Sequence, residues 1–166
     1  MWAGRQQHAT SRLHPEIQVD TPRRTDMNFE LSTIDHIGAP AWNVATATSF
    51  FKRVGVLVVH EETIESFNIH AVFPDFDGVL LEFLEPTGEG RVKTFLEQHG
   101  PGFQHIAYRI PDIESAIIEL GAVGIRFRTD EPVTSVGGSR VIFVEEADSA
   151  GFGTELVERR EPVGSC

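Results

Sequence analysis

Apolar and polar residues follow a simple order in the first half of the chain. A weakly alternating run over 32–40 predicts a strand, and apolar residues at helical spacing over 43–54 predict a helix. Three β-rich runs follow at 56–61, 67–73 and 79–85, and turn residues separate the last two of them. The first half therefore predicts a β-α-β-β-β unit.

The same order returns in the second half. An alternating run over 104–110 predicts a strand, and apolar spacing from 111 to 120 predicts a helix. Short apolar runs over 125–128, 141–144 and 153–158 predict three further strands. Two β-α-β-β-β units in one chain indicate an internal duplication.

A unit with one half-buried sheet and one helix is too small to be stable by itself. Joined edge to edge, the two units predict an α+β fold in which paired βαβββ modules form a curved eight-stranded half-barrel around a cup. The expected organisation is a flexible N-terminal extension at 1–31, module one at 32–86, a linker with a short helix at 87–102, module two at 103–158 and a C-terminal tail at 159–166.

Composition narrows the range of partners. The formal net charge of −11 leaves no electrostatic footprint for nucleic acid and opposes binding to an anionic membrane. The one cysteine, Cys166, excludes an intramolecular disulfide and a cysteine-rich zinc site. Because residues 1–26 also lack an apolar signal segment, the expected location is the cytoplasm. We expect a small-molecule substrate, no nucleic acid and no membrane.

One histidine and one acid recur in matching places of the two units. His36 and His105 each open a strand, and Glu82 and Glu155 each lie in the closing strand. Taken singly, such a histidine is most often structural, and such an acid is salt-bridged or exposed at an edge. An acid inside the apolar run 80–84 needs a strong partner to stay charged. The recurrence therefore favours a divalent ion such as Co, Zn, Mn or Ni in a metal-binding cup.

The order of five short motifs resembles the vicinal oxygen chelate (glyoxalase) superfamily, and within it the methylmalonyl-CoA epimerases. The resemblance covers about residues 32–158. The motifs are IDHIG at 34–38, LEFLEP at 81–86, QHIA at 104–107, GGSRVIF at 137–143 and TELVE at 154–158.

The resemblance implies a metal site and a reaction. His36, Glu82, His105 and Glu155 match the family's metal-ligand positions. In the epimerases, the metal chelates the carboxylate and thioester oxygens of the substrate and stabilises an enolate. Epimerisation needs one acid/base on each face of that enolate, and Glu155 is the candidate for one face. The resemblance also implies an acyl-CoA thioester substrate and a homodimer.

The chain departs from the epimerase pattern in three places. Strand 67–73 has no acid where relatives can carry a glutamate; His70 is its only titratable side chain and is the candidate second base, or else faces solvent. Residues 145–149 (EEADS) replace a stretch that commonly contains a lysine, and Gln104 replaces a histidine. Arg140 is a candidate contact for a substrate anion, with an ordinary surface arginine as the alternative.

Three functions follow from these observations. The leading interpretation is a metal-dependent isomerase of the epimerase type. The departures keep open a related metal-dependent lyase, glyoxalase-like isomerase or cyclase acting on another substrate of secondary metabolism. A dioxygenase is less favoured because its iron site uses one carboxylate, and Glu82 would be a second. A non-catalytic small-molecule-binding protein of the same fold is the third interpretation, and the four candidate ligands count against it.

Overall fold

The computed structural model describes residues 31, 33–76, 78 and 80–160. The predicted extension at 1–31 therefore lies almost wholly outside the described residues, as does most of the predicted tail, with Cys166. Within the described part of the chain, no helix is long and apolar enough to cross a membrane.

Module one has the predicted order of elements. Strand β1 and helix α1 are followed by three strands, and a short 3-10 turn at Glu65–Phe67 separates the first two of these. That turn shortens the strand predicted over 67–73, because Asn68 adopts a left-handed backbone conformation (φ 52°) before the strand begins. The bounds are β1 Ile34–Pro40, α1 Val44–Arg53, β2 Val58–Ile64, β3 Ile69–Pro74 and β4 Leu80–Pro86.

Module two repeats this order after a connecting helix, α2 (Arg91–His99). Short 3-10 turns at Val136–Gly138 (η2) and Glu146–Asp148 (η3) flank its third strand. The bounds of the remaining elements are β5 His105–Arg109, α3 Ile113–Ala122, β6 Val133–Thr134, β7 Arg140–Phe143 and β8 Gly153–Glu158.

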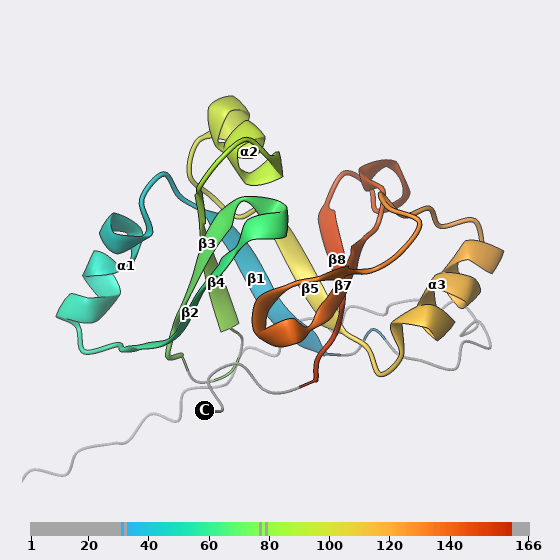
Figure 1. Ribbon diagram of the computed structural model, residues 1–166, viewed down its shortest axis with the longest axis horizontal. Coiled ribbons are helices and arrows are strands. Elements are labelled where there is room, and N and C mark those ends of the chain that lie inside the picture. The colour runs from blue at the N-terminus through green and yellow to red at the C-terminus, as the bar shows by residue number, and fades with distance from the viewer. Residues whose placement is uncertain (1–30, 32, 77, 79, 161–166) are drawn as a thin grey trace, which may run out of the picture.

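All the named strands join one curved sheet with the helices outside it (Figure 1). The strand order is β2-β3-β4-β1-β5-β8-β7-β6. In each module the histidine strand pairs in parallel with the acid strand, β1 with β4 and β5 with β8. The antiparallel pair β1–β5 joins the modules at the centre. The predicted α+β half-barrel of two βαβββ modules is confirmed.

The edge of module two differs from the prediction. Residues 125–128 form only an isolated bridge between Phe127 and Val144, and Val133–Thr134 supplies the edge strand instead. Two backbone hydrogen bonds, Glu145 N to Arg126 O and Arg128 N to Phe143 O, make this single antiparallel bridge at the end of β7. Beside it, the backbone N–H and the guanidinium of Arg126 donate to the Asp148 carboxylate in the turn after β7, so this N–H is not available for sheet pairing.

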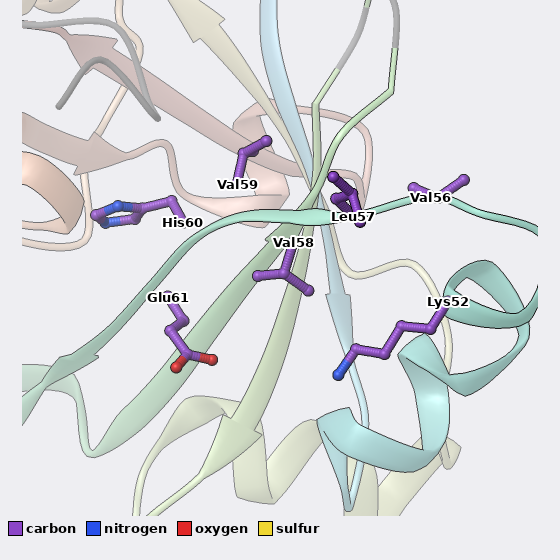
Figure 2. A pocket seen from close by; sticks show the side chains of 7 residues that line it. All are labelled: Lys52, Val56, Leu57, Val58, Val59, His60 and Glu61. Atoms are coloured by element: carbon purple, nitrogen blue, oxygen red, sulfur yellow. The ribbon is translucent and has the colours of Figure 1, made fainter.

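Module one has a shallow surface groove beside its outer edge (Figure 2). Lys52 of α1 and residues 56–61 line it, and the β2 side chains there alternate between partly buried and exposed. It lies apart from the central strands that bring the two modules together.

Candidate metal centre

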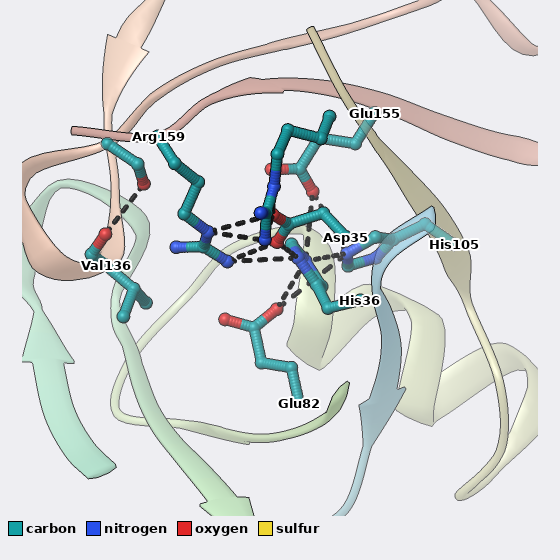
Figure 3. Close-up of polar contacts among 9 residues, drawn as sticks. Asp35, His36, Glu82, His105, Val136, Glu155 and Arg159 are labelled. Carbon is teal, nitrogen blue, oxygen red and sulfur yellow. Dashed lines mark hydrogen bonds and ion pairs between the residues drawn. The ribbon is translucent and has the colours of Figure 1, made fainter. Parts of the chain in front are cut away.

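Four side chains converge at the middle of the sheet (Figure 3). His36 and Glu82 come from β1 and β4, and His105 and Glu155 come from β5 and β8. These strands are consecutive in the sheet, in the order β4-β1-β5-β8. All four residues are buried. The duplication thus brings the four predicted ligands, one from each central strand, to a single place.

The side-chain atoms of the quartet lie at the spacing of neighbours in a coordination shell. His36 Nε2 lies 3.1 Å from Glu82 Oε2 and 3.7 Å from Glu155 Oε2, and His105 Nε2 lies 3.0 Å from Glu155 Oε2 and 3.8 Å from Glu82 Oε2. The two Nε2 atoms are 3.3 Å apart. Ligands placed about 2.1 Å from an ion are separated by about 3.0–3.4 Å at adjacent positions. The ligand atoms of His36, His105 and Glu155 all lie close enough together to hold one first-row divalent ion, and Glu82 lies beside them as a candidate fourth ligand.

Burial and charge act in opposite directions in the quartet. Burial disfavours a charge on His36, but the carboxylate of Glu82 and hydrogen bonds with Asp35 and Glu155 raise the pKa of His36 well above its ordinary value. Burial alone would raise the pKa of Glu155, yet hydrogen bonds from His105 and His36 lower it to about 2. Without an ion, hydrogen bonds from the two imidazoles thus keep Glu155 ionised.

The outer nitrogen of each imidazole also has a partner. His36 Nδ1 lies 2.9 Å from Asp35 Oδ1, and His105 Nδ1 lies 3.2 Å from Gln104 Oε1. Because both oxygens accept hydrogen bonds, each Nδ1 carries a proton, and Nε2 is the nitrogen that would face a metal ion in the cup. Asp35 in turn accepts from Arg159 and Arg109, and the buried hydrogen bonds with His36 and Arg159 hold the Asp35 pKa well below its ordinary range even though burial opposes this.

Sequence reasoning missed the two arginines and gave Asp35 no role. Asp35 lies beside a predicted ligand, and this adjacency was the available signal. Arg159 falls in the segment predicted to be a tail, where nothing in the sequence indicates that its side chain returns to β1.

Gly38 provides the space for His105. A Cβ at position 38 would lie 2.0 Å from His105 Cε1, and Gly38 pairs with His105 in the β1–β5 register. The absence of a side chain therefore allows the imidazole to lie against β1. The matching residue of module two is Ala107, which pairs with His36.

A cavity of about 220 Å³ opens beside the quartet. Its lining includes Glu82, His105 and Glu155 together with apolar side chains from both modules and two guanidinium groups. Such a mixture suits a small molecule that has one metal-binding end and one apolar part. The other lining residues are Phe67, Ile69, Leu84, Arg91, Val92, Gln104, Arg128, Thr129, Val133, Ser135 and Phe143.

Two predicted site residues do not join the quartet. His70 pairs with Glu85 in the sheet while Ala71 pairs with Leu84, so His70 lies on the face opposite Glu82. Its Nδ1 is 3.2 Å from Thr63 Oγ1. The position of His70 gives no support to its predicted role as second base.

Arg140 also lies outside the cavity lining. Its guanidinium donates to Glu114 of α3 and lies 3.8 Å from Glu158. The Arg140 guanidinium, which was predicted to contact a substrate anion, is instead paired with these two acids.

The fold and the buried quartet define a protein of the vicinal oxygen chelate type. The chain belongs to the glyoxalase/bleomycin resistance protein/dioxygenase superfamily, which it matches over residues 35–143. This confirms the family indicated by the sequence motifs.

Several relatives within this family are epimerases. The chain is 29% identical to the uncharacterized protein YqjC of Bacillus subtilis over 81% of its own length and 95% of that protein. It is 25% identical to mouse mitochondrial methylmalonyl-CoA epimerase, over 77% of this chain and 74% of the relative. Among solved structures, a variant of Streptomyces coelicolor methylmalonyl-CoA epimerase in complex with 2-nitronate-propionyl-CoA superposes with a TM-score of 0.74 at 29% identity, covering 80% of this chain and all of that one.

Proposed function

We propose that this protein is a metal-dependent isomerase that acts through an enolate, as an epimerase of the methylmalonyl-CoA type. The convergence of the two imidazoles on the two carboxylates carries this proposal: each Nε2 lies within 3.0–3.8 Å of both Glu82 and Glu155. These side chains would hold a divalent ion, which would supply Lewis-acid stabilisation of an enolate. The similarity to epimerases supports an acyl-CoA thioester as substrate.

The two carboxylates of the quartet are the proposed acid/base pair. Glu155 and Glu82 both line the cavity, one from each module. With the substrate bound in the cavity, one carboxylate would take the proton from one face of the reacting carbon, and the other, in its protonated form, would return a proton to the opposite face. This assignment gives Glu82 the role that the sequence suggested for His70.

A second candidate is a related lyase, isomerase or cyclase acting on another small acid, and Arg128 favours it. The Arg128 side chain is only 13% exposed, lines the cavity, and among the described residues its guanidinium donates only to Glu146, at 2.6 Å. Glu146 also lies near Arg91. Arg91 and Arg128 share Glu146, with Glu145 as a further acid near Arg128, and their guanidinium groups at the cavity wall could donate hydrogen bonds to a second anionic group of the substrate.

Proton exchange tests the leading proposal. Purified protein loaded with Co²⁺ is incubated with methylmalonyl-CoA in deuterated water, and deuterium at C2 is measured. We expect exchange in the wild type, loss of exchange in Glu155→Gln and Glu82→Gln, and unchanged exchange in the matched control His70→Ala. Bound metal without deuterium incorporation would reject the epimerase and favour the second candidate. Failure to bind metal would reject both.

The predicted homodimer remains a prediction from the resemblance. Its measurement is the molar mass in solution by light scattering.

A further inference from the structure

The two imidazoles of the quartet have unequal partners behind them. His36 Nδ1 faces a carboxylate, Asp35, whereas His105 Nδ1 faces the neutral amide of Gln104. A charged acceptor makes a stronger hydrogen bond than a neutral one and increases the electron density that the ring offers through its other nitrogen. The Nε2 atoms of the two histidines have similar surroundings. The two rings differ in the partner of Nδ1, which in each case is the preceding residue of the chain.

A β-bulge directs Asp35 toward the same side as His36. In the β1–β5 ladder, Ile34 pairs with Tyr108 and His36 with Ala107, so Asp35 is an extra residue without a partner in the register. Two neighbouring residues of a regular strand point to opposite faces, and a bulge removes this alternation locally. The backbone irregularity thus allows Asp35 to reach the ring of the next residue along the chain.

Two arginines hold the Asp35 carboxylate, Arg109 and Arg159, and Figure 3 shows Arg159 beside it. Arg159 Nε lies 3.0 Å from both carboxylate oxygens, and Arg109 Nε lies 2.9 Å from Oδ2. The Asp35 side chain is fully buried and that of Arg159 nearly so. A buried carboxylate with both oxygens bonded has one orientation, and this orientation is transmitted to the imidazole of His36.

Arg159 also connects this arrangement to the other module. It directly follows β8, the strand that contributes Glu155. Asp35 and Arg159 therefore join β1 of module one to the end of module two behind the quartet. In module two, Gln104 has no comparable clamp among the described residues.

We propose that Asp35 is a positioning residue that fixes the ring and tautomer of His36 and makes His36 the more strongly bound metal ligand of the two histidines. Arg159 maintains the carboxylate in the orientation that does this. The proposal rests on the metal site of the proposed function, but it concerns affinity and ligand geometry rather than the reaction. It predicts that removing the Asp35 carboxylate weakens metal binding through His36. It also predicts that a carboxylate at position 104 strengthens metal binding through His105.

Metal affinity of matched variants tests the proposal. The dissociation constant for Co²⁺ is measured by competition with a chromophoric chelator, and the visible d–d spectrum of bound Co²⁺ reports ligand geometry. The first variant is Asp35→Asn combined with Arg159→Gln, which avoids leaving the Arg159 guanidinium buried without its charge partner. The second is Gln104→Glu, which gives His105 a carboxylate like that behind His36. Thermal unfolding identifies any variant that has lost its fold.

We expect the double variant to bind Co²⁺ about 10–100-fold more weakly than the wild type with an altered spectrum, because that is the usual effect of removing a ligand's outer partner. Gln104→Glu is expected to bind more tightly with its fold unchanged. Wild-type affinity in the folded double variant, or an unchanged affinity in Gln104→Glu, would overturn the proposal. A wild-type protein that binds no Co²⁺ would instead reject the proposed function, so the two failures can be told apart.

Discussion

Modules one and two build their halves of the cup with the same backbone arrangement. In each, a histidine strand pairs in parallel with an acid strand, and a glutamate at the end of the acid strand accepts the N–H of the first residue of the module's helix. Glu85 accepts from Val44 N at 2.8 Å, and Glu158 accepts from Ile113 N at 2.9 Å. This glutamate lies three residues after the candidate ligand in both modules. The duplicated frame therefore fixes helix and ligand together.

The modules differ in what surrounds those shared features. Module one has an ionised partner behind its histidine and a glycine at position 38, whereas module two has Gln104 and Ala107 in the matching places. Strand pairing preserves the ligand positions, and the neighbouring side chains are free to diverge. Any functional inequality of the two halves therefore comes from residues beside the ligands.

Removing one ligand from either module is expected to have the largest effect. A site of this kind binds its ion with about 10–16 kcal/mol, so one of four ligands contributes roughly 3 kcal/mol on average. His36→Ala and His105→Ala should each weaken Co²⁺ binding by about 100-fold or more. Chelator competition measures this change. If either variant keeps wild-type affinity, that histidine is not a ligand and the symmetric quartet is wrong.

The helices offer the next comparison. Ile113 of α3 is fully buried in a cluster with Ile142 and Leu156, whereas Phe50 of α1 is 64% exposed. Ile113→Ala should lower the free energy of unfolding by about 2–5 kcal/mol because it leaves a cavity. Phe50→Ala should change it by less than about 0.5 kcal/mol. Urea unfolding of both variants checks the difference, and equal losses would show that α1 packs as tightly as α3.

Gly38 of module one and Ala107 of module two lie at matching places beside the cup. Exchanging these residue types should change metal affinity less than removing a ligand does. In Gly38→Ala the new methyl group overlaps the His105 ring, which must shift away from the other ligands. Overpacking of this kind costs about 1–3 kcal/mol, so we expect roughly tenfold weaker Co²⁺ binding. The matched variant Ala107→Gly should retain its metal affinity and lose roughly 1 kcal/mol of stability. Unchanged affinity in Gly38→Ala would mean that His105 has room to move.

The shared features of the two modules could be predicted from the sequence. The repeated order of periodic segments predicted the two modules, and the recurrence of one histidine and one acid predicted residues that do come together. These features depend on local periodicity and on strand alternation, which the sequence records directly.

Other features depend on register and on long-range contacts. The bulge at Asp35 changes which face a side chain occupies, and no local pattern announces it. Arg159 reaches Asp35 only because β8 and β1 lie on either side of β5. The run at 125–128 has strand-like composition, but it makes only the single bridge Phe127–Val144, and the Arg126 N–H binds Asp148 instead of a neighbouring strand.

The helix N-caps provide the smallest expected effect. Asn43 accepts from Thr46 N and Asp112 accepts from Ser115 N, with nearly identical backbone angles at the two caps. Only Asp112 is ionisable, and the backbone and hydroxyl hydrogen bonds from Ser115 lower its pKa in the folded protein. The unfolded chain therefore binds the proton more readily, so the stabilisation is present above the unfolded pKa and is lost as pH falls through the folded pKa.

The difference in unfolding free energy between the wild type and Asp112→Asn isolates this effect from the other acids of the chain. Urea unfolding is measured between pH 6 and pH 2. The wild type should be more stable than Asp112→Asn by a constant amount at the upper end of this range, where Asp112 is ionised, and this difference in unfolding free energy should shrink as the pH falls. The matched variant Asn43→Asp should acquire the same acid sensitivity in module one. If the stability of Asn43→Asp does not fall in acid, the two caps are not equivalent. The two modules would then share their backbone arrangement at the caps but not its electrostatics.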